Sequence, residues 1–418
     1  MTMSLLRARA PRAAVLALAV LAAACSDQGS SPLTPGLPPT LAPPKGAALA
    51  LLRCSASVRS RALSCADASS SAGGARFAVI GGQNVNVKLT STNVVYDSVA
   101  GIFSADLTVQ NLLVQRMGSD GATVSGVRVF FHSGPVLTSG TGSVEVANPD
   151  GVETFTASSQ PYFQYDGALP YLAVSAAKRW EWSLPKTAGS FDFLLLVSAP
   201  LVPTVVFDML VSGNRDIYRM GIDGNDLTRL TDNTGDDRDP TVAEGSVVFT
   251  SYRHGNAELY RVSLKALNVG ETRLTTTTDN ETSPALSPDG TRLAFIRSNA
   301  SVLGKLWLAA SDATGATQPT SSFGFSGDVE TGPSWFSAAK LTFVSTTAGS
   351  ADLYNLLVPG SPTKAPHQMN DIGDVDPAWN PDGRLAFASS RSGGTDLYAI
   401  SAGGELSQLT SRTGSDSH

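Results

Sequence analysis

The cysteines are the residues of this 418-residue chain with the most distinctive chemistry. Cys54 and Cys65 stand close together in the sequence, and an oxidising compartment would favour a disulfide between them. The closed loop would be small, so this bond would contribute about 2–3 kcal/mol to stability. Two buried thiols are the alternative. Two cysteines with no histidine nearby make an incomplete ligand set for zinc, so we predict no metal here and no cofactor.

Cys25 ends a segment that has the features of an export signal. Three arginines precede an apolar run at 13–24, which is too short to cross a bilayer because a crossing needs about 20 residues. The run closes with Ala23-Ala24-Cys25, which resembles the lipobox of bacterial lipoproteins, although Ala22 stands where leucine is usual. The resemblance implies a lipoprotein signal peptide at 1–24 and acyl chains such as palmitate on Cys25. An ordinary secretory signal is the alternative.

A lipidated Cys25 would make the membrane a partner of the chain, because several acyl chains hold a soluble domain stably at a bilayer. Ser26 follows the cysteine and Asp27 comes second, an order that favours the outer membrane in the enterobacterial sorting rule. We expect a cell-envelope protein that faces the periplasm or the cell surface. Without the three signal arginines, 27 basic and 36 acidic residues remain, so nucleic acid is not an expected partner.

Acidic side chains gather ahead of prolines in the second half of the chain, and tryptophans follow two of these prolines. Hard cations prefer oxygen ligands, but the spacing of the acids does not fit an EF-hand loop. We interpret the acids as turn residues of a repeated unit that line one of its faces, and the tryptophans as blade packing or a ligand funnel. The candidate binding residues are Asp236, Asp239, Asp279, Glu281, Trp335, Asp374, Asp376 and Trp379.

Catalytic motifs are missing from the sequence. It has no Gly-x-Ser-x-Gly, no His-Glu-x-x-His and no phosphate-binding Gly-x-x-x-x-Gly-Lys. The four histidines are scattered, and His254 falls in an expected surface turn. We therefore predict no catalytic residues and no enzyme activity.

The elements that would position these residues follow from a repeat. Five phenylalanines recur at intervals of 42, 46, 48 and 44 residues, and an Asp-Leu-Tyr-like marker follows each one. A repeat of about 40–50 residues with several short strands predicts a β-propeller. The repeated phenylalanines are Phe207, Phe249, Phe295, Phe343 and Phe387.

Two stretches carry a family resemblance. Pro284-Ala-Leu-Ser-Pro-Asp-Gly-Thr-Arg-Leu-Ala-Phe295 and Ser389-Ser-Arg-Ser-Gly-Gly-Thr-Asp-Leu-Tyr398 resemble the repeat of TolB-type β-propellers, over residues 204–418. The resemblance implies the fold and leaves the function open, because propellers host both binding and catalysis. Five phenylalanine strands predict five blades, but only four inner strands with proline are visible. Residues 411–418 or 192–202 could complete the first blade, and a sixth, degenerate blade is also open.

The remaining sequence divides before the propeller. Residues 25–49 are rich in Pro, Ser and Gly and are interpreted as a linker behind Cys25. Residues 50–200 contain alternating apolar and polar runs, which predict an immunoglobulin-like β-sandwich. In it, Trp180 and Trp182 would share one face, as core or as a sugar platform. The predicted class is all-β, with the propeller at 201–418.

The function that these features favour is a membrane-anchored envelope lipoprotein with a non-catalytic binding or scaffold role. Its propeller would bind an envelope protein or a cell-wall component through the acidic loops and the two tryptophans. The alternative is a propeller-type hydrolase or lyase that acts on an envelope or extracellular polymer and uses a carboxylate pair with perturbed pKa values.

Overall fold

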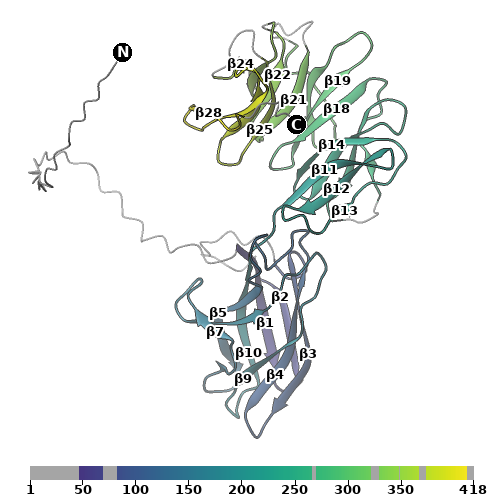
Figure 1. The fold of residues 1–418 in the computed structure, drawn as a ribbon. Coiled ribbons are helices and arrows are strands. Elements are labelled where there is room, and N and C mark those ends of the chain that lie inside the picture. The colour runs from purple at the N-terminus through teal and green to yellow at the C-terminus, as the bar shows by residue number, and fades with distance from the viewer. Residues whose placement is uncertain are drawn as a thin grey trace, which may run out of the picture. The chain divides into compact units, whose positions relative to one another are not determined.

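The computed structural model describes residues 47–68, 82–265, 270–321, 329–347, 349–366 and 373–411. Cys25, most of the predicted linker and the segment 412–418 lie outside these residues. All regular elements described are β-strands, which confirms the all-β prediction (Figure 1). Within the described part of the chain, no helix is long and apolar enough to cross a membrane.

The N-terminal region forms two sheets that enclose one core. Trp180 and Trp182 lie in that core with Phe103 and Phe191. The interpretation of these two tryptophans as core residues is therefore correct. The larger sheet has the order β2 (Ala62–Asp67), β1 (Ala47–Ser57), β10 (Ser190–Ala199), β5 (Val127–Ser139), β8 (Gln160–Tyr165) and β7 (Gly151–Glu153). The smaller has the order β3 (Val87–Asp97), β4 (Ile102–Asn111), β9 (Lys178–Ser183) and β6 (Glu145–Val146).

Two details of this region differ from the sequence reading. Strand β1 begins at Ala47, inside the predicted linker. The sequence did not reveal this start because its alanine- and leucine-rich residues lack the alternation that marks a half-buried strand. Strand β10 pairs with β1 and β5, so residues 192–199 do not complete the first blade. Cys54 and Cys65 face each other across β1 and β2 and are joined as a disulfide.

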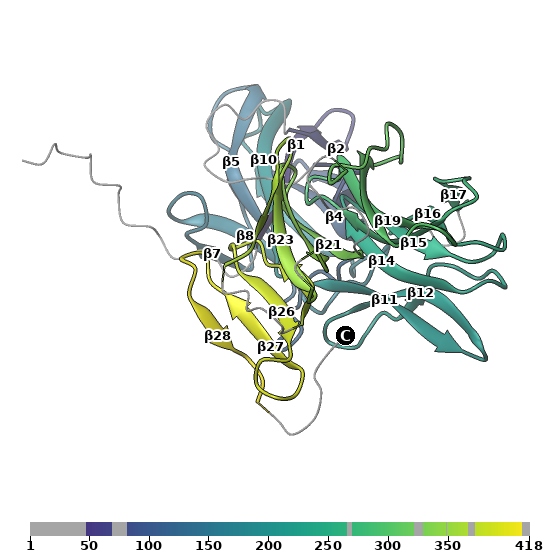
Figure 2. The ribbon, with the colours of Figure 1, turned by 90° about the horizontal axis from the view of Figure 1, so that it is seen from above.

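Five small antiparallel sheets follow, which we number as blades one to five (Figure 2). Blade one holds β11 (Thr204–Val211), β12 (Asn214–Gly221) and β13 (Thr228–Arg229). Blade two holds β14 (Asp237–Ala243), β15 (Ser246–Ser251), β16 (Glu258–Ser263) and β17 (Thr272–Arg273). Blade three holds β18 (Asn280–Leu286), β19 (Arg292–Ser298) and β20 (Lys305–Ala310). Blade four holds β21 (Glu330–Ser337), β22 (Lys340–Ser345), β23 (Asp352–Leu357) and β24 (Pro362–Lys364). Blade five holds β25 (Asp374–Trp379), β26 (Leu385–Ser389), β27 (Asp396–Ile400) and β28 (Leu406–Gln408).

One apolar contact joins each blade to the next. The residue after the marker acid of one blade packs beside the repeated phenylalanine of the following blade, as Ile217 does with Phe249 and Leu353 with Phe387. Burying two such side chains contributes several kcal/mol, at about 25 cal/mol per Å² of apolar surface. The repeat that predicted the blades is thus the spacing of their packing contacts.

Each of the four inner strands, β14, β18, β21 and β25, bends at a bulge just before its proline. The pairing shifts there, and the residue before the proline has a positive φ, as in Gly332 (53°). A bulge bends the strand and re-aims its side chains. The equivalent residues in the other blades are Asp239, Ser283 and Asp376.

We expect Gly332→Ala to lower the free energy of unfolding by about 1–2 kcal/mol, because a side chain disfavours this left-handed conformation. Space is not the cause, since a Cβ would meet the Pro377 and Val344 side chains at 3.5 and 3.8 Å. Chemical denaturation measures the change. Gly373→Ala is the matched control, because its φ is ordinary and a Cβ would meet nothing within 4 Å. Equal effects of the two substitutions would contradict the bulge conformation.

Candidate functional site

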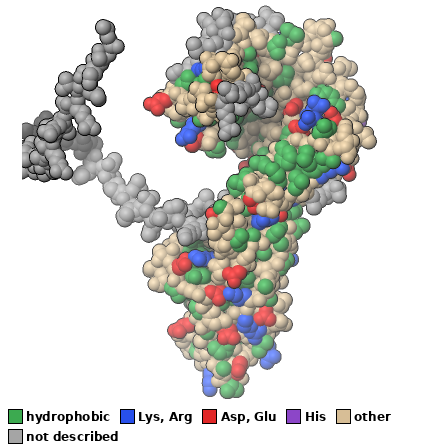
Figure 3. All heavy atoms as spheres, in the orientation of Figure 1, with side chains coloured by type: hydrophobic (Ala, Val, Ile, Leu, Met, Phe, Trp, Pro, Cys, Tyr) green, Lys and Arg blue, Asp and Glu red, His purple; other side chains and the backbone are tan. Residues whose placement is uncertain are grey.

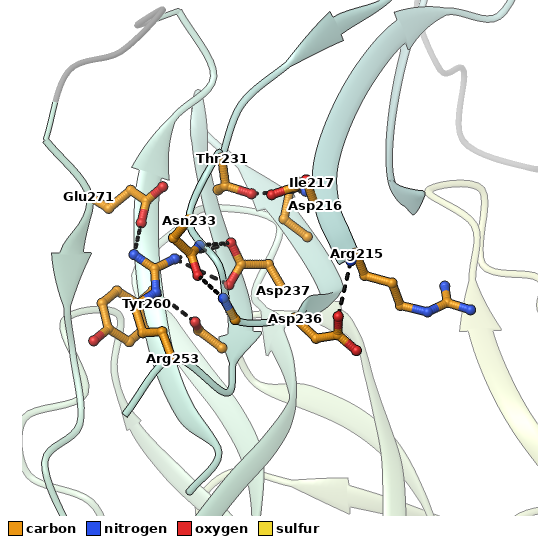
Figure 4. Close-up of polar contacts among 12 residues, drawn as sticks. Arg215, Asp216, Ile217, Thr231, Asn233, Asp236, Asp237, Arg253, Tyr260 and Glu271 are labelled. Carbon is orange, nitrogen blue, oxygen red and sulfur yellow. Dashed lines mark hydrogen bonds and ion pairs between the residues drawn. The ribbon is translucent and has the colours of Figure 1, made fainter. Parts of the chain in front are cut away.

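The candidate site lies where the chain passes from blade one to blade two, in the loop 231–236 and the first residues of β14 (Figure 4). Asp237 opens inner strand β14 and is fully buried. The Arg253 guanidinium binds both oxygens of Asp237, with Nη2 at 3.1 and 3.0 Å, and also pairs with Glu271. Asn233 donates a further hydrogen bond to Asp237 at 2.6 Å. The loop is therefore held by a desolvated ionic network.

The same arrangement recurs along the propeller. Glu281 accepts a hydrogen bond from Arg297 Nε at 2.8 Å, and Asp374 accepts two from Arg391 Nη2 at 3.0 and 2.9 Å. Each arginine also lies over an aromatic ring of its blade, as Arg253 does over Tyr260 at 4.2 Å. Cation–π contact and carboxylate pairing together fix the guanidinium. In blade four the acid is Glu330, which pairs with Lys305 at 3.8 Å.

A second row of acids lies on the strand that follows the phenylalanine strand in every blade except blade three, where Lys305 takes the position. Asp216 pairs with Arg229 at 2.6 Å and Glu258 with Arg273 at 2.8 Å. Asp352 pairs with Lys364 at 3.0 Å. These carboxylates are buried, and each cation comes from the outer strand of the same blade. The two rows place charged groups in pairs of opposite sign, as buried charges require.

Burial dominates the pKa of three of these carboxylates. It raises the pKa of Asp374, Glu281 and Asp216 above their ordinary values, and the arginine partners oppose that shift only in part. The partly exposed Asp236 behaves in the opposite way. The pKa of Asp236 is lowered, chiefly because Arg238 donates a hydrogen bond to it and secondly because the backbone amide of Arg215 does.

The structure separates the predicted binding residues into two groups. Glu281 and Asp374 are buried in ion pairs, whereas Asp236, Asp239, Asp279 and Asp376 reach the surface in part or in full. Asp236 joins Arg238, which lies over the partly exposed Tyr252 ring at 5.8 Å. This group presents an exposed aromatic ring beside charges of both signs, a combination suited to binding another molecule.

The two predicted tryptophans occupy equivalent positions with different exposure. Trp335 is buried, and its Nε1 donates to the Ala285 carbonyl at 3.0 Å. Trp379 is partly exposed and lies 4.4 Å below the Lys340 ammonium, in a hollow of about 240 Å³. Trp335 therefore serves packing, whereas Trp379 lines a surface hollow.

Sequence reasoning missed three parts of the site. Asp237 and Glu330 were passed over, although an acid stands three residues before each inner proline. Alignment on those prolines would have revealed the row. Arg253 and Arg391 follow the repeated phenylalanine by four residues, which is a second signal in the sequence. Tyr252 carries no repeat signal, and its exposure comes only from the structure.

The histidines that the structure describes have structural partners. His254 Nδ1 lies 2.6 Å from the Tyr260 hydroxyl, and His132 Nδ1 lies 2.8 Å from Thr156 Oγ1. Neither lies beside a serine or cysteine in a nucleophile–base arrangement. Among the described residues, no group of three or more His, Cys, Asp or Glu could hold a metal ion.

Comparison with known proteins bears on the propeller alone. Residues 199–336 match the TolB beta propeller domain. Comparison with curated proteins gives no match.

Solved structures give only distant likenesses. TolB from Acinetobacter baumannii is 14% identical, with a TM-score of 0.42, over 50% of this chain and 54% of that one. A puromycin-hydrolyzing peptidase of Mycobacterium tuberculosis is 14% identical, with a TM-score of 0.41, over 78% and 46%. An oligogalacturonate lyase from Vibrio parahaemolyticus is 13% identical, with a TM-score of 0.37, over 49% and 61%. The chain thus spans about half the length of these proteins, and the likenesses carry no argument about activity.

The assignment rests on the family match together with the repeated sheets. The four-stranded sheets, the phenylalanine repeat and the acid–arginine rows extend beyond the matched residues to blade five. The repeat-bearing half of the chain is a TolB-like β-propeller.

Proposed function

We propose that the chain is a lipid-anchored protein of the cell envelope whose propeller is a non-catalytic binding module. Its partner would be an envelope protein or a cell-wall component. The observation that carries the proposal is that some of the acidic residues are buried in ion pairs and others reach the surface. The buried carboxylates are held by cations, whereas Asp239 and Asp376 occupy exposed or partly exposed bulges of equivalent inner strands.

The buried pairs favour a structural role over catalysis. A general acid or base must reach a substrate proton and exchange it. Asp237 and Asp374 are fully buried, and both oxygens of each accept hydrogen bonds from an arginine. Such carboxylates hold the blades and leave recognition to the exposed groups. Asp236, Arg238 and Tyr252 offer one contact surface of this kind.

We expect the stability advantage of the wild type over Asp374→Asn to shrink as pH rises from the ordinary pKa of an aspartate, about 4, through the raised pKa of Asp374. Because burial raises the pKa of Asp374, the folded state binds more protons than the unfolded state in this window. The wild type therefore loses stability with rising pH, and the variant lacks that contribution. Urea denaturation at several pH values measures the difference. An advantage that grows with pH would show that Arg391 outweighs burial.

We expect affinity capture of the double variant Asp239→Asn, Asp376→Asn from cross-linked envelopes to recover severalfold less partner than capture of the wild type. Mass spectrometry measures the amounts of the captured protein and of its partner. Asparagine tolerates a positive φ, so the bulges persist while two charges are removed. The matched control is Asp289→Asn with Asp312→Asn, which changes two exposed turns outside the inner-strand bulges. Equal recovery of the partner by the two double variants would show that the bulge acids do not belong to the binding surface. No partner even with the wild type would favour the hydrolase or lyase alternative.

We expect Cys25→Ser to move the protein from the membrane fraction to the soluble fraction, because the acyl chains would be the membrane attachment. Fractionation and immunoblotting measure the distribution. Cys54→Ser with Cys65→Ser is the control, since these residues pair with each other in the structure. Retention of Cys25→Ser on the membrane would contradict lipid anchoring.

A further inference from the structure

The hollow that holds Trp379 lies between blades four and five and combines aromatic rings with one cation. Its volume is about 240 Å³, below the range of about 300–1,000 Å³ that is usual for ligand pockets, so its occupant would be small. Among the described residues that line it, none is an aspartate or a glutamate. We call it the basic–aromatic hollow, and its main lining residues are Phe336, Lys340, Asn355, Trp379, Leu385 and Ile400.

This hollow lies at the end of the blades away from the buried acid–arginine pairs. The turns of an antiparallel blade alternate between its two ends. The turn between β25 and β26 contributes Gly383 to the hollow, and the turn between β27 and β28 contributes Ser401 and Gly404. Asp374 and Arg391 instead pair at the start of β25 and in the hairpin between β26 and β27. The hollow is therefore separate from the site described above.

The Lys340 ammonium is held on two aromatic rings. Its Nζ lies 4.4 Å from the centroid of the Trp379 ring and 5.4 Å from that of Phe336, and the two rings lie 4.9 Å apart. Cation–π attraction stabilises this position. Among the residues that the structure describes, no carboxylate forms an ion pair with Lys340. Its charge is therefore available to an anion that enters the hollow.

Asn355 adds a neutral donor to the same hollow. Trp379 Nε1 donates a hydrogen bond to Thr342 Oγ1 at 2.9 Å, and Thr342 Oγ1 donates to Asn355 Oδ1 at 2.6 Å. Because the oxygen of this amide accepts, its nitrogen keeps hydrogens that it can donate to a ligand. A carboxylate only accepts hydrogen bonds, so it matches a lysine and an amide donor.

The rest of the lining favours an apolar body over a sugar. Leu385 and Ile400 form an apolar wall beside the aromatic rings. Ser401 Oγ already accepts a hydrogen bond from the Glu405 amide at 3.1 Å. The hydroxyl groups of a sugar would lose water here and find few partners, which is unfavourable, whereas an apolar group gains by leaving water.

Comparison among the blades shows which part of this arrangement is particular to the hollow. Lys340 stands three residues before the repeated Phe343, and Arg292 and Arg384 stand at the equivalent positions of blades three and five. Arg292 lines a hollow of about 580 Å³ between blades three and four, but no aromatic residue is among the described residues that line it. The cation therefore recurs, whereas its aromatic setting does not.

Exposed apolar side chains elsewhere on the propeller also lack this setting. Figure 3 shows a band of hydrophobic side chains where Figure 1 draws β11. Its exposed members are Val205, Leu210 and Val211. The hollow differs from that band because it presents a cation that is held on aromatic rings.

We propose that the basic–aromatic hollow binds a small organic carboxylate with an apolar body. Lys340 and Asn355 would bind the carboxylate, and the body would pack on Trp379 and the apolar wall. The site involves neither the acidic bulges nor the lipid anchor, so it and the proposed function can fail independently. A free acid and the chain end of a peptide both carry this chemistry, and the test separates these two sources.

The test titrates phenylacetate and its neutral amide, phenylacetamide, into the full-length protein, with binding measured by ligand-observed NMR. Phenylacetate should bind more tightly than the amide. Lys340→Met should weaken the binding of phenylacetate about tenfold, because hydrogen bonds to charged groups are the stronger kind, and methionine keeps an apolar stem of similar length. Arg384→Met is the matched control, because Arg384 is exposed at the equivalent position of blade five and does not line the hollow.

Three outcomes would overturn the proposal. They are no binding of phenylacetate to the wild type, equal binding of the acid and the amide, and equal weakening by Lys340→Met and Arg384→Met. Acetyl-glycyl-phenylalanine then identifies the source of the carboxylate. Tighter binding of this peptide than of phenylacetate would assign the hollow to a chain end, and weaker binding would assign it to a free acid.

The indole N–H of Trp379 gives a second measurement that locates the ligand. Its NMR signal, assigned with Trp379→Phe, should shift when phenylacetate binds, because this indole lies in the hollow and begins the hydrogen-bond chain to Asn355. The Trp335 indole is the control, since it is buried and donates to the Ala285 carbonyl. Binding without a shift of the Trp379 signal would place the ligand elsewhere and overturn the proposal.

Discussion

Buried carboxylates are the constraint on which the propeller depends. Asp237, Glu281 and Asp374 lie fully buried at the start of inner strands, and an unpaired charge there would cost several kcal/mol. The blade must therefore bring an arginine to each of them. Arg253 and Arg391 come from the hairpin between the second and third strands, and Arg297 comes from the second strand itself. The aromatic residues of those strands then support the guanidinium from one side. Strand spacing, hairpin geometry and ring placement all follow from satisfying these charges.

The same constraint also bears on which side chains of the propeller could contact another molecule. Side chains that pair within a blade stabilise that blade, whereas the bulge before each inner proline interrupts the strand pairing at one residue. The bulge residues differ between blades, as Asp239, Ser283, Gly332 and Asp376 do. A constant frame thus carries a variable set of side chains, which is the usual basis of specificity in a repeat protein.

The sequence predicted the propeller because the phenylalanine period is itself the period of the blade contacts. It predicted less of the site, since an acid in a turn looks the same whether it is buried or exposed. Glu281 and Asp279 stand two residues apart, yet one is fully buried and the other reaches the surface. That difference depends on Arg297, which stands in the next strand. The start of β1 at Ala47 was missed for a related reason, because small residues give little periodic signal.

The contact between blades has a direction. One face of a blade offers the leucine or isoleucine that follows the first residue of its marker, and the opposite face offers the phenylalanine, so two identical faces never meet. Such an interface is heterologous, and units joined through it form a head-to-tail series without an internal two-fold axis. Duplicating or deleting one blade-length segment would leave every remaining junction chemically unchanged. A segment of one blade length is therefore a unit that can be added or removed without changing the kind of contact between the remaining blades.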